Sequence, residues 1–174
     1  MNYRLLKKSE LKLLDEIDRR EIVDEVYYFK DNKLEIVNEF YNIEGWNLKD
    51  LNDYINRLKD IHDRNGTIYG AFCDNKIIGL AALESKFIGE NNDQLKLDML
   101  YISHNYRKKG VGKKLINLLS ERAKELGAKS LYISATPFKN TVDFYFVMGA
   151  RLTKKINKDL YELEPYDIHM ELEL

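Results

Sequence analysis

The segment from Arg107 to Lys114, RKKGVGKK, is the part of this sequence that most restricts how the chain folds. It lies between an apolar run at residues 95–102 and an amphipathic run at residues 111–126, which predict a strand followed by a helix. Two glycines and five Lys or Arg residues then fall at a helix N-terminus, where cations oppose the helix dipole. A bound anion would offset that cost, because helix N-termini present unpaired N–H groups and glycine lets a ligand approach the main chain.

Two common phosphate-binding motifs do not fit this segment. A P-loop requires glycine where this chain has Arg107 and Ser or Thr where it has Lys114. A dinucleotide-binding fingerprint requires Gly or Ala three residues after Gly112, where this chain has Leu115. The pattern that remains is R-x-x-G-x-G after a strand, and the alternative without a ligand is a solvated, lysine-rich helix start.

Composition indicates the general class of protein. The 174 residues suffice for one domain, residues 1–174, and the 44% apolar and 33% charged residues are typical of a globular protein. The net charge of −1 gives no overall attraction to nucleic acid or membrane, so anion binding has to be local. A charged N-terminus, and the lack of the ~20-residue apolar stretch that a membrane span needs, predict a cytoplasmic protein.

Hydrophobic periodicity predicts a mixed α/β fold, in which helices cover both faces of one layered sheet. In the first part of the chain we expect a strand at 3–6, a helix at 10–19 after Ser9 as N-cap, a β-hairpin of 21–29 and 35–41 around Asp31-Asn32, and a helix at 48–64 after Asn47 as N-cap. Thereafter we expect a hairpin of 67–73 and 76–84 around Asp74-Asn75, a loop at 85–93, a strand at 95–102, a helix at 111–126 before Gly127, a strand at 129–135, a short helix between Asn140 as cap and Gly149, and strands at 151–155 and 168–172 around a loop at Pro165.

From Leu95 to Ala150, the order strand, R-x-x-G-x-G, helix, strand and short helix with Phe144-Tyr145 resembles the core of the GNAT superfamily of acetyl-CoA-dependent N-acetyltransferases. The hairpin before this core and the terminal strand also match that fold, so the resemblance covers most of the chain after Thr67. It implies a GNAT-like acyl-CoA N-acyltransferase fold with acetyl-CoA as cosubstrate and no metal. The hairpin at residues 23–41 is a variation, since many relatives have helix there, and it leaves the acceptor open.

The resemblance also implies which residues bind acetyl-CoA. In the family, the backbone of the strand before the loop holds the pantetheine arm, and the loop amides hold the diphosphate. Relatives often carry an asparagine seven residues before the tyrosine of the short helix, where this chain has Phe138. The implied cofactor-binding residues are Leu100, Tyr101, Ile102, Arg107, Lys108, Lys109, Gly110, Val111, Gly112, Lys113, Asn140 and Tyr145.

The mechanism that the resemblance implies is direct attack by a primary amine in a ternary complex, with Tyr145 protonating the departing CoA thiolate. An alkylamine with a pKa near ~10.4 must first lose a proton, and a carboxylate can accept it. Asp98 is the first candidate, because strand alternation puts it on the face of Leu100, and Glu84 is the second. A backbone N–H near Leu100 would stabilise the oxyanion. The alternatives are a core aromatic for Tyr145 and structural carboxylates for the other two.

The acceptor and the partners follow less directly from the residues. The alternative function is a CoA-binding regulatory or interaction module without catalysis. Nucleic-acid binding is excluded, because the cations form one short run without interleaved aromatic residues. Exposed strands would allow a homodimer.

The three histidines and the single cysteine predict no metal site. Side chains that could line a site for a cationic amine are Glu39, Glu44, Glu84, Asp98, Tyr41 and Trp46.

Overall fold

The computed structural model describes residues 1–31 and 33–174. The strands are β1 (Asn2–Leu5), β2 (Glu21–Lys30), β3 (Lys33–Ile43), β4 (Thr67–Cys73), β5 (Lys76–Ile88), β6 (Gln94–Ile102), β7 (Ser130–Ala135), β8 (Arg151–Leu152) and β9 (Ile168–Glu173). The α-helices are α1 (Leu48–Asp63), α2 (Val111–Glu125), α3 (Lys139–Val147) and α4 (Lys158–Leu163), and two 3₁₀ helices are η1 (Lys8–Glu16) and η2 (His104–Tyr106). None of these helices is long and apolar enough to cross a membrane.

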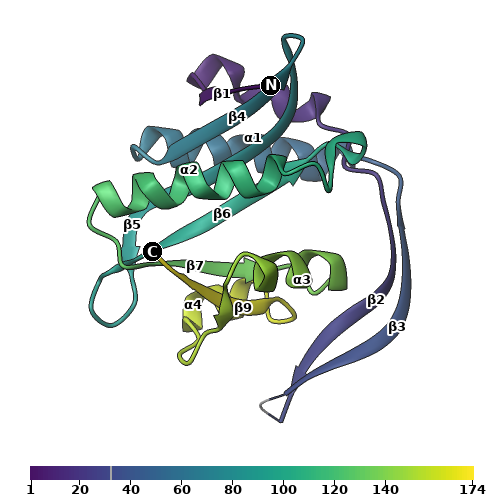
Figure 1. Ribbon diagram of the computed structural model, residues 1–174, viewed down its shortest axis with the longest axis vertical. Coiled ribbons are helices and arrows are strands. Elements are labelled where there is room, and N and C mark those ends of the chain that lie inside the picture. Colours follow the sequence, from purple (N-terminus) through teal and green to yellow (C-terminus); the bar gives the residue numbers. More distant parts are fainter. Residues whose placement is uncertain (32) are drawn as a thin grey trace.

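Seven of the strands form one mixed sheet in the order β1-β4-β5-β6-β7-β9-β8. Its neighbouring strands run antiparallel, apart from β6 and β7, which are parallel. The helices cover both faces, as the sequence predicted: apolar side chains of α2 pack on one face, and those of η1 and α1 on the other. Figure 1 shows α2 across the front of the sheet and α1 behind it.

Strands β2 and β3 pair with each other and form a separate antiparallel sheet. Figure 1 shows them as a long arm beside the main sheet. The arm is attached to the segment between β7 and α3, because the Tyr27 amide donates a 2.7 Å hydrogen bond to the Pro137 carbonyl and the Tyr27 hydroxyl one of 2.8 Å to Asp143. Asp31 has a left-handed φ of 49°, whereas Asn32, the other half of the predicted turn, lies outside the described residues.

Several predicted boundaries are confirmed by backbone conformation. Asp74 and Asn75 both have positive φ, 49° and 63°, as a tight two-residue hairpin turn requires. Gly127 and Gly149, with φ of 95° and 94°, follow the ends of α2 and α3. The side chain of Asn47 caps α1 by accepting a 2.8 Å hydrogen bond from the amide of Lys49.

Other local expectations were wrong. The first helix is a 3₁₀ helix that follows Lys7, and Ser9 lies inside it. Glu10 decides that start, because its carboxylate accepts hydrogen bonds from the Lys7 amide and from Arg4. Strand β5 continues to Ile88 through part of the predicted loop, since pairing with β6 supplies its backbone partners.

The C-terminal segment also differs from expectation. Asn140 lies in the first turn of α3, and the cap position is Phe138, which forms a β-bridge with Val26 of the arm. The strand predicted at 151–155 pairs with β9 only at Arg151 and Leu152. The predicted loop before Pro165 contains α4, whose start is capped by Asn157 through a 3.2 Å hydrogen bond from the Leu160 amide.

Candidate active site

The N-terminus of α2 has backbone donors without helical partners. Gly110 is its N-cap with a φ of 81°, and no side chain caps the helix. The first helical hydrogen bond runs from the Lys114 amide to the Gly110 carbonyl, so the amides of Val111, Gly112 and Lys113 point out of the helix end. The first turn contains no acidic residue, and both lysine side chains there are exposed. This helix end therefore suits a polyanionic group such as a diphosphate.

Arg107 differs from the lysines that follow it. Its Nη1 lies 2.9 Å from the Glu21 carboxylate, and its Nε and Nη2 donate hydrogen bonds to the carbonyls of Ile102 and Arg19. The guanidinium thereby ties the loop to the end of β6 and to the start of β2. The loop cations with exposed side chains are Lys108, Lys109, Lys113 and Lys114.

Gly112 has a packing role as well. A Cβ atom at this position would lie 3.2 Å from Cζ of Phe144 on α3 and 3.7 Å from Cγ1 of Ile102 on β6. A Cβ here would require the ring of Phe144 to shift by a few tenths of an ångström. Glycine thus favours close packing of α2 against Phe144, in addition to any ligand at the main chain.

Strands β6 and β7 separate beside this helix end. They pair over Gln94–Leu97 and Ser130–Ile133, after which β7 pairs with β9 alone and β6 continues along β5. The Ser103 amide donates to the Ile78 carbonyl of β5, so by alternation the amides of Leu100 and Ile102 face away from β5 and toward the gap. The gap between β6 and β7 therefore offers free strand edge next to the N-terminus of α2.

Tyr145 lies on α3 in the core cluster that α2 covers, with 6% of its surface exposed. Burial raises the pKa of this tyrosine, and the negative charge of Asp167 raises it further. The phenol accordingly stays protonated at neutral pH and can act as a proton donor.

Asp98 lies on the opposite face of β6 from the one expected. The register passes from Ala82 opposite Met99 to Leu83 opposite Leu97, so Asp98 forms a β-bulge. The bulge shifts the alternation by one residue: Leu100 packs with the α2 cluster, whereas the Asp98 carboxylate lies 2.5 Å from Arg57 Nη2 of α1. Strand alternation alone was wrong about this face.

The Asp98 carboxylate is buried and paired. Its side chain is 2% exposed, and its Oδ1 lies 3.1 Å from Nζ of Lys96 as well as next to Arg57. The other oxygen, Oδ2, has no hydrogen-bond partner among the described residues. One oxygen of Asp98 is therefore fixed by two cations, and the other is buried without a partner among the described residues.

Two further sequence candidates, Glu84 and Asn140, have different surroundings from Asp98. Glu84 lies on β5 near the end of α1, where its Oε1 accepts a 2.9 Å hydrogen bond from Nη2 of Arg64. Asn140 is exposed on the first turn of α3 and does not cap that helix.

Asp167, which sequence reasoning missed, lies just before β9. Burial raises the pKa of its carboxyl to about 7, and Glu164 raises it while Lys96 and Arg57 lower it. Its negative charge in turn raises the pKa of Tyr145. A position two residues after Pro165, in a segment read as a loop, gave no signal of this role.

His169 on β9 adds a second buried group near Asp167. Its Nδ1 lies 2.8 Å from the hydroxyl of Tyr132, while its Nε2 is buried without a partner among the described residues. Burial lowers the pKa of His169. Ser134, its cross-strand neighbour on β7, likewise has an unpartnered buried hydroxyl. Unsatisfied buried groups gathered where two strands separate are typical of a site that receives a polar ligand.

A family model supports the functional reading of this geometry. The model of the acetyltransferase (GNAT) family matches residues 31–149, more than half of the chain. The chain belongs to the GNAT family of acetyltransferases. The expectation of a GNAT acetyltransferase is thus confirmed.

Solved structures show the same fold. This GNAT protein is similar to nourseothricin acetyltransferase, with 18% identity, a TM-score of 0.72 and coverage of 99% of this chain and 97% of the other. It is similar to PaiA N-acetyltransferase from Thermoplasma acidophilum in complex with coenzyme A, with 18% identity, a TM-score of 0.65 and complete coverage, 100% of each chain. A GNAT acetyltransferase from Elizabethkingia anophelis with acetyl-CoA bound is 19% identical, with a TM-score of 0.53 over 68% of this chain and 82% of the other. No curated protein matches the GNAT chain significantly in sequence.

Proposed function

We propose that this GNAT protein transfers the acetyl group of acetyl-CoA to a primary amine by direct attack in a ternary complex. The observation that carries the proposal is the position of the gap between β6 and β7 directly beside the uncapped N-terminus of α2. The free edge of β6 suits the amides of a pantetheine arm, and the helix end suits the diphosphate. One extended molecule would thereby reach both.

Within this mechanism, Tyr145 donates a proton to the departing CoA thiolate. Its raised pKa keeps the phenol protonated until a strong base forms next to it. The amide of Leu100, which faces the gap, stabilises the oxygen of the tetrahedral intermediate as negative charge develops there. The amine nitrogen forms a bond to the acetyl carbon, and the carbon–sulfur bond breaks. The second proton that the nitrogen loses as the amide forms replaces the one that Tyr145 gave to the thiolate.

A carboxyl at the gap must accept the proton that the attacking ammonium loses. We assign this step to Asp167, because a carboxyl with a pKa of about 7 is half ionised at neutral pH and is a stronger base than an ordinary carboxylate. Asp98, with Oδ1 fixed by Arg57 and Lys96, positions these two cations, which lower the pKa of Asp167. Glu84 is bound to Arg64 away from the gap and has no part in this scheme.

The test is an assay of thiol release from acetyl-CoA with a panel of amines: alkylamines, amino acids, a peptide N-terminus and a protein lysine. Calorimetry with CoA accompanies it, to separate binding from turnover. We expect CoA binding and acetyl transfer to at least one class of amine. CoA binding without turnover on any amine would support the alternative of a non-catalytic CoA-binding module. Absence of CoA binding would reject both functions.

A further inference from the structure

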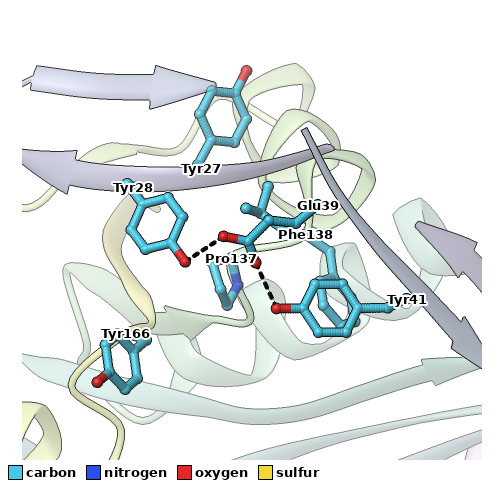
Figure 2. A pocket seen from close by; sticks show the side chains of 8 residues that line it. Tyr27, Tyr28, Glu39, Tyr41, Pro137, Phe138 and Tyr166 are labelled. Carbon is cyan, nitrogen blue, oxygen red and sulfur yellow. Dashed lines mark hydrogen bonds between the residues drawn. The ribbon is translucent and has the colours of Figure 1, made fainter. Parts of the chain in front are cut away.

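A pocket lies between the β2–β3 arm and the body of the protein. It has a volume of about 320 Å³ and is lined by Val26, Tyr27, Tyr28, Glu39, Tyr41, Pro137, Phe138 and Tyr166. Figure 2 shows the carboxylate of Glu39 between the hydroxyls of Tyr28 and Tyr41, with Tyr166 nearby. The lining comes from both strands of the arm, from the segment after β7 and from the segment before β9. The volume fits a small ligand or one end of a larger ligand.

Glu39 is held as an ionised carboxylate. It accepts hydrogen bonds of 2.6 Å from the hydroxyls of Tyr28 and Tyr41, one on each oxygen. These bonds lower the pKa of Glu39, that from Tyr28 most. Among the residues that the structure describes, no Lys, Arg or His lies within 4.0 Å of this carboxylate, since none forms an ion pair with it. The pocket thus contains a fixed negative charge without a cation.

Aromatic rings surround this charge. The rings of Tyr41 and Phe138 pack at 5.5 Å between centroids, and Tyr28 and Tyr166 line the same pocket. Aromatic faces attract organic cations through the quadrupole of the ring, and a carboxylate in the same pocket adds direct attraction. A hydrated metal ion gains little from aromatic walls, and an anion is repelled by Glu39. The lining therefore matches an alkylammonium group.

Two residues that line the pocket are chain neighbours of candidate-site elements. Phe138 precedes the first residue of α3, the helix that carries Tyr145, and Tyr166 is the chain neighbour of Asp167. The arm is joined to this region by the bridge from Val26 to Phe138. A ligand in the pocket would therefore have one end near the groups that we assign to proton transfer.

We infer that this pocket binds the second ammonium group of a dicationic amine acceptor, whose other amine reacts at the gap. The inference rests on the proposed acetyl transfer and specifies its acceptor. Glu39 recognises the remote charge, and the rings of Tyr28 and Tyr41, which donate to Glu39, flank it. Of the side chains named from sequence as an amine site, the structure brings together Glu39 and Tyr41. Trp46 packs instead against Tyr54 and Tyr101.

The test compares 1,5-diaminopentane with 1-aminopentane, two acceptors of equal chain length that differ in one charge. We expect kcat/KM for the diamine to exceed that for the monoamine at least tenfold, as a charge-assisted contact with an aromatic enclosure provides. Glu39→Gln should reduce the ratio to within about threefold of unity. Glu44→Gln, the same change at an exposed site outside the pocket, is the control and should keep the ratio.

Lysine methyl ester also carries two ammonium groups. Its kcat/KM relative to that for 1,5-diaminopentane distinguishes a lysine derivative from a free diamine as the acceptor. Calorimetry of 1,5-diaminopentane with the wild type and Glu39→Gln separates this inference from the proposed function. Binding that Glu39→Gln weakens at least tenfold supports the pocket even if no acetyl transfer occurs. Acetyl transfer with equal kcat/KM for the diamine and the monoamine, or a ratio that Glu39→Gln leaves unchanged, overturns the pocket and leaves the proposed function intact.

Discussion

Asp98 on β6 and Arg57 on α1 form a hydrogen-bonded ion pair of 2.5 Å that joins the sheet to the helix behind it. The carboxylate reaches Arg57 because the β-bulge turns it toward α1, and Lys96, with 8% of its side chain exposed, contacts the same oxygen. A buried carboxylate that holds two cations stabilises the fold only as long as all partners remain. Asp98 therefore holds in place the two cations that lower the pKa of Asp167.

The first prediction concerns Asp98→Ala. The change leaves Lys96 buried and without its counter-charge, so we expect the free energy of unfolding to fall by about 3 kcal/mol. Urea denaturation followed by circular dichroism measures it. Asp63→Ala is the control, because Asp63 and Lys8 form an exposed pair with both side chains 52% exposed, and its loss should cost less than about 1 kcal/mol. Equal effects of the two variants would contradict the structural role of Asp98.

The second prediction concerns Tyr145→Phe. Without its phenolic proton the enzyme must release CoA as an unprotonated thiolate, and we expect kcat to fall roughly 10²–10⁴-fold. Calorimetry should give nearly unchanged CoA affinity. Tyr3→Phe removes a hydroxyl whose hydrogen bond goes to Met1 at the exposed N-terminus, and it should leave kcat unchanged. A Tyr145→Phe enzyme with normal turnover would remove this residue from the mechanism.

The third prediction concerns the charge at the N-terminus of α2. Lys113→Glu places a negative charge beside the proposed diphosphate position, and we expect the Kd for CoA to rise roughly tenfold, less at high salt. The matched change is Lys124→Glu in the last turn of the same helix, which should alter the Kd less than about twofold. The two variants carry equal net charge, so a common effect would indicate bulk electrostatics instead of a local site.

The fourth prediction is the pH profile of the reaction. If Asp167 takes the proton, kcat at saturating amine rises through a limb near pH 7, because the carboxyl must be ionised and its pKa is raised to about 7. Asp167→Asn should abolish this limb. Glu164→Gln should move it to lower pH, since Glu164 raises the pKa of Asp167. A limb that stays in place in both variants would assign the proton to another group.

The fifth prediction is the contribution of Asp167 to stability. Its pKa is higher in the folded chain, about 7, than the ordinary 3.8, so the native state binds more protons between these two values. The contribution to stability is therefore full below pH 3.8 and is lost as pH rises through about 7. We measure the free energy of unfolding of Asp167→Asn and of the wild type in urea. The variant should accordingly gain more stability over the wild type at pH 8 than at pH 5. An equal difference in the free energy of unfolding between variant and wild type at both pH values would mean that the Asp167 carboxyl is solvated.

Local sequence was sufficient wherever neighbouring residues decide the conformation. The two positive φ values that a tight turn needs were predictable at Asp74 and Asn75, because these residue types tolerate them. The glycines at 110 and 112, between an apolar and an amphipathic run, likewise identified the strand, turn and helix that the structure contains. The start of the first helix was not predictable in this way, since it depends on a contact of Glu10 with Arg4 on β1.

The sequence by itself determined the α/β class, the R-x-x-G-x-G helix start and Tyr145 on its short helix, because these are short-range patterns. Only the tertiary structure decided what surrounds them. A bulge that depends on pairing with β5 turns Asp98 to the other face, and folding brings Asp167 near Lys96 although 71 positions separate them in the numbering. The pocket around Glu39 depends likewise on the arm meeting the segment after β7. Pairing register and burial are properties of the whole packed chain, so no local pattern specifies them.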